Sequence, residues 1–303
     1  VAMPNTPALP SRTFGSVLTA MVTPFDVEGR LDIPAAQALA THLVDSGCDG
    51  LVLSGTTGES PTTHQPEKDK LVRAVVDAVG DRATIVAGAG SNDTAHAVRI
   101  AQCAESAGAH GLLVVTPYYN RPSQEGVYRH LRTIVESTDL PAMLYDIPGR
   151  TGVAIADDTL DRLAELPQVR AVKDATGNVG AGFARMVRTG LEFYSGDDAL
   201  NLAWLAQGGS GVVSVVGHVA AGPYAQLVAA VDAGDLASAR RIAASLVPLV
   251  HAVMGRGQGA VFAKAAMELL RVIPSRTVRL PLVAADPSEL AELEHVLASE
   301  GIL

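Results

Sequence analysis

The sequence predicts an α/β protein, a (β/α)8 TIM barrel with a C-terminal helical appendage, and three observations support this fold. Eight short apolar runs recur between residues 17 and 216, and each is followed by a segment with helical periodicity. The runs are continuously apolar, as parallel strands are when both of their faces are covered. From about Asp235 onward the pattern changes to helices alone. Eight strand–helix units in succession are typical of a closed barrel.

The predicted strands and helices have the composition and the end residues that are typical of such elements. The apolar runs are rich in β-branched residues, and they cover residues 17–23, 50–55, 84–88, 111–116, 142–147, 169–173, 191–195 and 211–216. The helical segments cover residues 34–46, 66–79, 93–107, 123–137, 157–166, 179–189, 198–207 and 223–233. Pro34 and Pro66 suit a first helical turn, where a missing N–H is harmless. Asp93 and Asp157 suit N-caps or first-turn acids.

The chain divides into three predicted parts. Residues 1–13 form a disordered or loosely held tail, residues 14–234 the catalytic barrel, and residues 235–303 a C-terminal helical domain. Helices in the last part are predicted at residues 236–254, 260–271 and 287–299. We expect them to pack on the barrel or on a neighbouring subunit. The proline-rich tail lacks the charged and apolar regions of a signal peptide.

A doubly wound open sheet is the rival fold. It usually has fewer strands and often carries a glycine fingerprint after the first one. Here the first predicted strand is followed by Thr23-Pro24-Phe25-Asp26, and no G-x-x-x-x-G-K-[ST] motif occurs. Neither a dinucleotide site nor a P-loop is therefore expected.

The composition excludes several classes of function. The chain of 303 residues has 23 Lys and Arg against 32 Asp and Glu, a net charge of −9, which disfavours a nucleic-acid partner. With 48% apolar and 18% charged residues, the chain is too apolar to be disordered. No apolar run approaches the roughly 20 residues of a bilayer span. We therefore expect no membrane partner and a cytoplasmic location.

Cysteine and histidine usage gives no support to a disulfide or a metal site. Cys48 and Cys103 cannot form a disulfide framework or a four-cysteine zinc site, and both are expected to be buried thiols in a reducing compartment. The eight histidines show no H-E-x-x-H motif or other ligand spacing. His64, His96 and His218 are expected in loops or on helix surfaces.

The sharpest candidate for chemistry is Lys173, because catalytic groups of such a barrel lie at the C-terminal ends of the strands. Lys173 ends an apolar run, so its stem should lie inside the barrel mouth. A desolvated ammonium loses its proton more easily, and the resulting amine attacks a keto group to give a Schiff base without any added cofactor. The alternative is a lysine that reaches solvent from a strand end and pairs with Asp174. Position alone leaves both roles open.

Other polar groups follow neighbouring strands. The Tyr145 hydroxyl can exchange a proton beside Lys173, or it can be a buried hydroxyl with a satisfied partner. Thr56 and Thr57 lie in a glycine-flanked turn that suits a carboxylate, or that merely caps the next segment. Arg150 follows a Pro-Gly turn and suits a substrate carboxylate or a surface ion pair.

Two further acids are interpreted as structural. Asp197 and Asp198 lie near the start of a predicted helix, where acids are stabilising. The spacing Ser195-x-x-Asp198 matches a capping box.

Together these motifs resemble the pyruvate-dependent Schiff-base aldolases and lyases, and within that superfamily the dihydrodipicolinate synthase (4-hydroxy-tetrahydrodipicolinate synthase) family in its actinobacterial form. The resemblance covers residues 14–303. It rests on segments 18–25, 55–62, 115–120, 145–152, 172–175 and 194–199. Several long motifs in the right order are far more specific than any one of them.

The resemblance implies catalytic roles. Lys173 forms the imine with pyruvate, and Tyr145 protonates and deprotonates during imine formation and ring closure. Thr57 links Tyr145 to Tyr119 in a proton relay, and Tyr119 comes from an adjacent subunit. The implied assembly is therefore at least a dimer and usually a homotetramer.

The resemblance also implies binding roles and an activity. Thr56 and Thr57 hold the pyruvate carboxylate, Arg150 binds the carboxylate of aspartate semialdehyde, and Gly196 and Val213 offer backbone groups. The activity is condensation of pyruvate with L-aspartate 4-semialdehyde to 4-hydroxy-tetrahydrodipicolinate. This is the first committed step of the diaminopimelate and lysine pathway.

One departure concerns regulation. Lysine-inhibited members carry a histidine, a glutamate and other polar groups here. At several of those places this sequence has Pro61, Gln65, Lys68 and His96, although Asn92 and Tyr118 remain. A lysine ligand would lack its carboxylate partner if His96 replaces the acid. We expect weak or absent inhibition by lysine.

Three other functions stay open at this point. A lyase of the same superfamily acting on a sugar acid is disfavoured because Arg150 and Tyr119 occur together. A catalytically silent barrel that binds a keto acid is disfavoured by the intact set of Lys173, Tyr145, Thr57, Tyr119 and Arg150. A metal-dependent aldolase lacks the ligand spacings.

Overall fold

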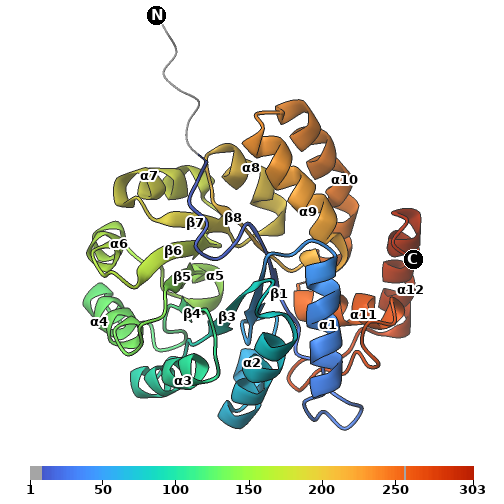
Figure 1. The fold of residues 1–303 in the computed structure, drawn as a ribbon, viewed down its shortest axis with the longest axis horizontal. Coiled ribbons are helices and arrows are strands. Elements are labelled where there is room, and N and C mark those ends of the chain that lie inside the picture. Colours follow the sequence, from blue (N-terminus) through green and yellow to red (C-terminus); the bar gives the residue numbers. More distant parts are fainter. Residues whose placement is uncertain (1–8, 256) are drawn as a thin grey trace, which may run out of the picture.

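The computed structural model describes residues 9–255 and 257–303, so most of the predicted tail lies outside the described residues. Eight parallel strands pair in chain order, and β1 pairs with both β2 and β8, which closes the sheet (Figure 1). The strands are β1 (Val17–Ala20), β2 (Gly50–Leu53), β3 (Thr84–Gly88), β4 (Gly111–Val115), β5 (Ala142–Asp146), β6 (Val169–Asp174), β7 (Glu192–Ser195) and β8 (Gly211–Ser214). The predicted barrel is confirmed.

Helices follow the strands, and the longer ones form a ring outside the barrel (Figure 1). They are α1 (Ile33–Asp45), α2 (Gln65–Val79), α3 (Thr94–Ser106), α4 (Gln124–Val135), α5 (Pro148–Thr151), α6 (Asp157–Ala164), α7 (Val179–Thr189), α8 (Asn201–Ala206) and α9 (Gly217–Asp232), with 3-10 turns η1 (Ser60–Thr62) and η2 (Asp198–Leu200). Asp93 caps α3, and Asp157 lies in the first turn of α6, as their positions predict.

Several boundaries differ from the prediction. Residues 21–23, 54–55 and 215–216 have already left the sheet and begin the loops above the barrel. The helix predicted at 198–207 is divided into η2 and α8. Helix α9 begins at Gly217, before the predicted start at Pro223, and is kinked at the non-helical Ala220. Helix α5 escapes prediction because four residues are too few to show a period.

Three helices follow the barrel: α10 (Leu236–Met254), α11 (Gly259–Leu269) and α12 (Pro287–Ser299). Helix α10 packs against α9 and α12, and α11 packs against α9, α10 and α12, along one side of the barrel (Figure 1). Among the described helices, α10 alone also has the length and composition of a membrane span, and 22% of that stretch is buried. Its buried residues include Leu246, Leu249 and Val253.

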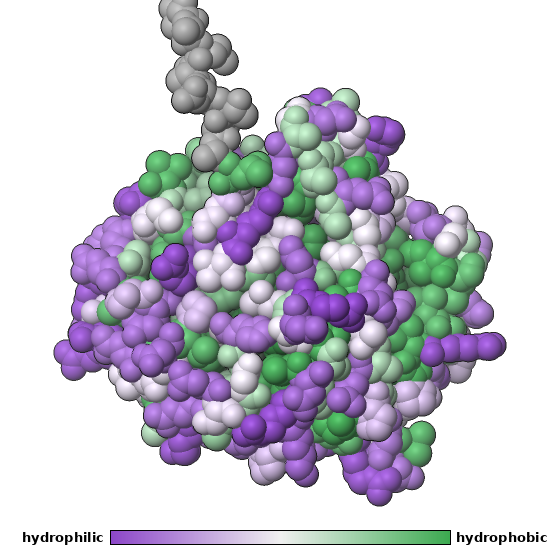
Figure 2. Space-filling view, in the orientation of Figure 1, coloured by the Kyte–Doolittle hydropathy of each residue, from purple (hydrophilic) through white to green (hydrophobic). Residues whose placement is uncertain are grey.

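The apolar core has two layers, because alternate residues of each strand point into the barrel and toward the helices. The layer inside the barrel consists of Phe14, Leu18, Ala20, Val52, Val86, Leu113, Met143, Tyr145, Ala171, Tyr194 and Val213. The larger layer fills the space between strands and helices. Outside, polar side chains cover most of the face in Figure 2, and apolar ones gather at its right edge near the C-terminal helices.

Phe14 closes the barrel at the amino ends of the strands. Its buried ring meets the ring of Tyr194 edge-on, with 6.2 Å between centroids. A Cβ at Gly111 would lie 2.6 Å from this ring, so the close approach requires glycine. Glu192 accepts hydrogen bonds from the Tyr194 hydroxyl and from residues 11 and 13, which belong to the predicted tail. The loops at the opposite, carboxyl end of the barrel surround a cavity.

The predicted burial is confirmed for Cys48, whereas the environments of His218 and Cys103 differ from the prediction. His218 is wholly buried rather than on a surface, because its Nε2 accepts from the Val22 N–H while its Nδ1 bonds the Val215 carbonyl. Burial lowers the pKa of His218 to about 4. Cys48 is buried, which raises the pKa of its thiol to about 12, whereas Cys103 is only half-buried on α3. Both thiols are free.

Candidate active site

A cavity of about 250 Å³ opens at the carboxyl ends of the strands. Its walls come from the ends of β2 to β5 and from the loops that follow them. The lining residues are Ser54, Gly55, Thr56, Ser60, Pro61, Gly88, Gly90, Leu113, Val115, Tyr118, Tyr145, Ile147, Arg150 and Thr151. The lining is mainly apolar, with a few polar side chains, as in most small-molecule sites.

The register of β5 and β6 places Tyr145 opposite Lys173. Both side chains point into the barrel, and the Lys173 Nζ lies 4.2 Å from the centroid of the Tyr145 ring. Lys173 is buried, as its position at the end of an apolar run predicts. No ion pair joins it to Asp174 in the described part of the chain, because neighbouring residues of a strand point to opposite faces. The structure therefore brings an amine and a phenol together, and of the two residues Tyr145 lines the cavity whereas Lys173 does not.

The three buried lysines of the described chain differ in their partners. Lys68 donates to Ser60 and Thr63, and Lys264 is paired with Glu59. Lys173 has no hydrogen bond or ion pair among residues 9–255 and 257–303. Its amine is therefore the one among the three that is free to meet a ligand.

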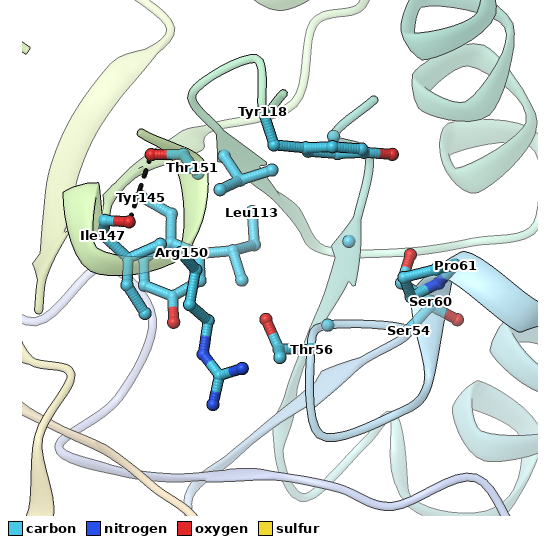
Figure 3. A pocket seen from close by; sticks show the side chains of 14 residues that line it. Ser54, Thr56, Ser60, Pro61, Leu113, Tyr118, Tyr145, Ile147, Arg150 and Thr151 are labelled. Carbon is cyan, nitrogen blue, oxygen red and sulfur yellow. Dashed lines mark hydrogen bonds between the residues drawn. The ribbon is translucent and has the colours of Figure 1, made fainter. Parts of the chain in front are cut away.

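Arg150 is carried by the short helix α5, which directly follows β5. Pro148 begins this helix, and Gly152 ends it at a φ of 76°. The Thr151 hydroxyl donates to the Ile147 carbonyl at 3.1 Å and to the Val153 carbonyl, which fixes the turn. In Figure 3 the Arg150 guanidinium, the Tyr145 hydroxyl and the Thr56 hydroxyl point toward one common region.

The charge of Arg150 is uncompensated. Its side chain is exposed, and no carboxylate pairs with it among the described residues. It is the one charged side chain that lines the cavity in the part of the chain that the structure describes. A surface ion pair is thus not its role here, and a guanidinium at the rim is suited to a ligand carboxylate.

The threonine turn after β2, residues 54–59, is tightly packed. Ser54 adopts a left-handed φ of 52°, and a Cβ at Gly88 would lie only 2.3 Å from the Ser54 carbonyl. Thr56 is exposed at the cavity wall, whereas Thr57 is buried and is not among the lining residues. The turn is held on the β1 side by the Thr23 hydroxyl, which donates to the Gly58 carbonyl at 2.7 Å.

The other predicted site residues are more dispersed. A Cβ at Gly196 would lie 3.1 Å from the Lys173 Cε, so the Gly196 backbone borders the lysine. Val213 is buried inside the barrel. Tyr119 is 89% exposed and has a left-handed φ of 75°, while its neighbour Tyr118 lines the cavity. The structure therefore does not bring Tyr119 to Thr57 and Tyr145 within one chain.

Asp197 and Asp198 are structural, but the predicted capping box is wrong. Asp197 is itself the N-cap of η2, and its carboxylate accepts from the Ala199 N–H. Asp198 is buried, and it accepts hydrogen bonds from the Ser214 hydroxyl and from the N–H groups of residues 215 and 216. Its function is to fix the end of β8.

Known proteins resemble this chain over nearly its whole length. The model of the dihydrodipicolinate synthetase family matches residues 13–300. The chain belongs to this family. Within the family, a 4-hydroxy-tetrahydrodipicolinate synthase of Kineococcus radiotolerans is 57% identical over 98% of this chain and 96% of its own length. A second enzyme of that name, from Streptomyces coelicolor, is 53% identical over 97% of both chains.

Solved structures of the dihydrodipicolinate synthase type have the same fold. The enzyme of Cyanidioschyzon merolae, solved with lysine bound, superposes with a TM-score of 0.92 at 40% identity over 97% of this chain and all of its own. The Acinetobacter baumannii enzyme, solved with pyruvate, superposes with a TM-score of 0.91 at 32% identity over 96% of this chain and all of its own.

Some residues of the site escape prediction from the sequence. Ser54 lines the cavity, and its buried hydroxyl has no partner among the described residues. Nothing in the sequence marks it, because it resembles any serine that ends a strand. Asp146 and Asp174 lie within the segments 145–152 and 172–175 that carry the resemblance, but their shared environment depends on the strand register. No group of three potential metal ligands occurs in the described residues.

Asp146 and Asp174 form a buried acid pair behind the lysine and the tyrosine. They are register partners one residue beyond Tyr145 and Lys173, and they face the helices. Arg185 of α7 donates to Asp146 at 3.2 Å, while the Asp174 Oδ2 has no hydrogen-bond partner among the described residues. Burial, and to a lesser extent the charge of Asp174, raises the pKa of Asp146 to about 6. Burial also raises the pKa of Asp174.

This acid pair predicts a pH dependence of stability. Because the folded state raises the Asp146 pKa, its contribution to stability is complete below pH 4 and is lost as the pH rises through about 6. Asp146→Asn should therefore gain on the order of 2 kcal/mol relative to the parent protein between pH 4 and pH 7. Urea unfolding of both proteins across this range measures the difference, with Asp77→Asn, which is exposed on α2, as control. Parallel profiles for parent and Asp146→Asn would contradict the assignment.

Proposed function

We propose that this chain condenses pyruvate with L-aspartate 4-semialdehyde to give 4-hydroxy-tetrahydrodipicolinate, the first committed step of the diaminopimelate and lysine pathway. One observation carries the proposal: Lys173, which is buried and has no hydrogen bond or ion pair among the described residues, lies beside Tyr145. Tyr145 and Arg150 line the same cavity. Relatives that are named for this activity match the chain over nearly their full lengths.

The proposed reaction begins with Lys173. Its amine adds to the keto carbon of pyruvate, and loss of water gives an imine. The imine draws electrons from the adjacent methyl group, which loses a proton and becomes an enamine. The enamine carbon then bonds to the aldehyde carbon, and the aldehyde oxygen takes up a proton. Finally the amino group of the semialdehyde attacks the imine carbon, closes the ring and releases the Lys173 amine.

Tyr145 is the proposed acid and base of these steps. Its ring lies against Lys173, so its hydroxyl lies where protons must be delivered and removed. The imine itself serves as the electron sink, and we propose no cofactor and no metal.

The two substrates carry separate carboxylates, which need separate binding groups. We propose that Thr56 and Thr57 hold the pyruvate carboxylate through N–H groups and hydroxyls. Arg150, at the rim, binds the carboxylate of the semialdehyde. Gly196 and Val213 offer backbone groups to the bound substrate, and Gly196 borders Lys173.

Tyr119 is proposed to act from a second subunit. Its ring is 89% exposed although its backbone is held in a left-handed conformation, a combination that suits a side chain presented to a partner. In a dimer at least, and in the proposed homotetramer, this ring completes a relay from Thr57 to Tyr145. We place the enzyme in the cytoplasm.

Substrate choice is the first test of the proposal. Purified protein should consume pyruvate with aspartate semialdehyde, and not with glyceraldehyde or N-acetylmannosamine. Lys173→Ala should reduce this rate by more than about 1,000-fold, because the nucleophile is lost. The exposed Lys70→Ala is the matched control and should keep full activity. Consumption with a sugar aldehyde instead would assign the chain to the sugar-acid lyases.

Arg150 is tested by separating the two substrates. Arg150→Ala should raise the KM for aspartate semialdehyde by about 10- to 100-fold, the cost of a charge-assisted hydrogen bond. The KM for pyruvate should change little, and Arg129→Ala on α4 should leave both values unchanged. An equal loss for both substrates would show that Arg150 has a structural role.

Lysine inhibition is expected to be weak or absent. His96 lies in the first turn of α3 and offers no carboxylate to a cationic ligand. Initial rates with millimolar L-lysine should therefore match those without it, while His96→Glu should introduce sensitivity. A rate halved by millimolar lysine in the parent protein would contradict this expectation.

A further inference from the structure

We propose that Glu59 and Lys264 are positioning residues. Their ion pair joins the threonine turn to the C-terminal helices and fixes the turn in the position in which it binds the pyruvate carboxylate. The inference rests on the proposed function, and it gives Lys264, which follows the barrel, a part in positioning the groups that bind pyruvate. It is carried by a buried ion pair that joins residues 205 positions apart in the sequence.

Glu59 ends the turn that begins after β2. It is 2% exposed and adopts a left-handed φ of 54°, a conformation that a glutamate enters only when its surroundings impose it. Each carboxylate oxygen has its own donor. The Lys264 Nζ lies 2.5 Å from Oε1, and the Arg279 N–H lies 2.9 Å from Oε2. The carboxylate is thus fixed in both position and orientation.

Lys264 lies on α11 and is completely buried. Besides Glu59, its ammonium donates to the Thr277 carbonyl at 2.7 Å and lies 4.0 Å from the centroid of the Phe25 ring. Burial lowers the pKa of Lys264 to about 8, while Glu59 favours the charged form. All of its partners are protein groups, which leaves no surface for a ligand and indicates a structural purpose.

Arg279 provides a second tie between the same two regions. Its guanidinium donates to the carbonyls of Gly29 and Thr62 and forms an ion pair with Glu67. Thr62 ends the 3-10 turn η1 that directly follows Glu59. The segment 59–62 is therefore held at both ends by residues that follow the barrel.

The turn needs such support because the sheet does not provide it. Strand β2 ends at Leu53, so residues 54–59 have no ladder partner. Apart from bonds among residues 54–63, the Gly58 carbonyl is held by Thr23, and the Glu59 carboxylate by Lys264 and Arg279. Thr56 and Thr57 lie between strand and anchor, so a shift of Glu59 moves their N–H groups and hydroxyls.

A buried ion pair is weak evidence for stability, because apolar residues of similar volume often replace one without loss. The geometry of the pair is more informative than its contribution to stability. When every hydrogen bond of a buried charged pair is satisfied, the two side chains can adopt only one arrangement. Pyruvate binds the turn before and during the reaction, so misplacing the turn should weaken binding in both states. Such a loss raises KM without lowering kcat.

The test uses Glu59→Gln, Lys264→Met and the double variant, each assayed with pyruvate and aspartate semialdehyde. Each single variant should raise the KM for pyruvate by at least about tenfold, with kcat changed less than about threefold. Each should also lower the Tm, because one buried polar group loses its partner. The double variant leaves no uncompensated buried charge, so it should regain part of the Tm that the single variants lose, while its KM for pyruvate stays raised.

Asp232→Asn is the matched control, since it removes a partly buried ion pair with Arg12 that lies far from the turn, at the amino ends of the strands. It should leave the KM for pyruvate unchanged. A double variant whose Tm and KM both return to parent values would overturn the proposal, as would single variants that lose only Tm or kcat. Failure of the parent protein to condense the two substrates would instead overturn the proposed function.

Discussion

The register between β5 and β6 is the constraint on which the site depends. It pairs Tyr145 with Lys173 and Asp146 with Asp174. Because side chains alternate across a strand, the first pair points into the barrel and the second toward α7. A slip by one residue would exchange the amine and phenol for two carboxylates. The same register therefore places the amine and phenol of the proposed mechanism on one face and the acid pair, of which Asp146 accepts from Arg185, on the other.

The two ends of the barrel have different tasks. Phe14 and Tyr194 fill the amino end, and Glu192 ties the chain beneath them. The carboxyl end is left to short turns that the sheet does not hold, and these turns carry the groups assigned to substrate. Their support comes from elsewhere in the chain: from Asp198 under β8, and from the C-terminal helices under the threonine turn. The packed amino end closes the barrel, and the turns at the carboxyl end are each held in place by other parts of the chain.

The strands and most helices can be predicted from the sequence because each repeats a local pattern. Lys173 and Arg150 can also be recognised there, since Lys173 lies at the end of an apolar run and Arg150 follows a Pro-Gly turn. The pairing of Asp146 with Asp174 and of Glu59 with Lys264 cannot be predicted in this way, because both depend on contacts between distant segments. The burial of His218 and the role of Asp198 escape for the same reason. A histidine or an acid near a helix start looks exposed until its partners from other loops are known.

The account requires that Lys173, and no other lysine, forms the covalent bond to pyruvate. The chain has four lysines: Lys68, Lys70, Lys173 and Lys264. Two of the others are buried and fully engaged by protein oxygens, and Lys70 is exposed. Reduction of the enzyme with borohydride in the presence of pyruvate, followed by peptide mass spectrometry, measures this directly. The account predicts one reduced adduct, on the peptide that carries Lys173; no adduct, or an adduct on any other lysine, would contradict it.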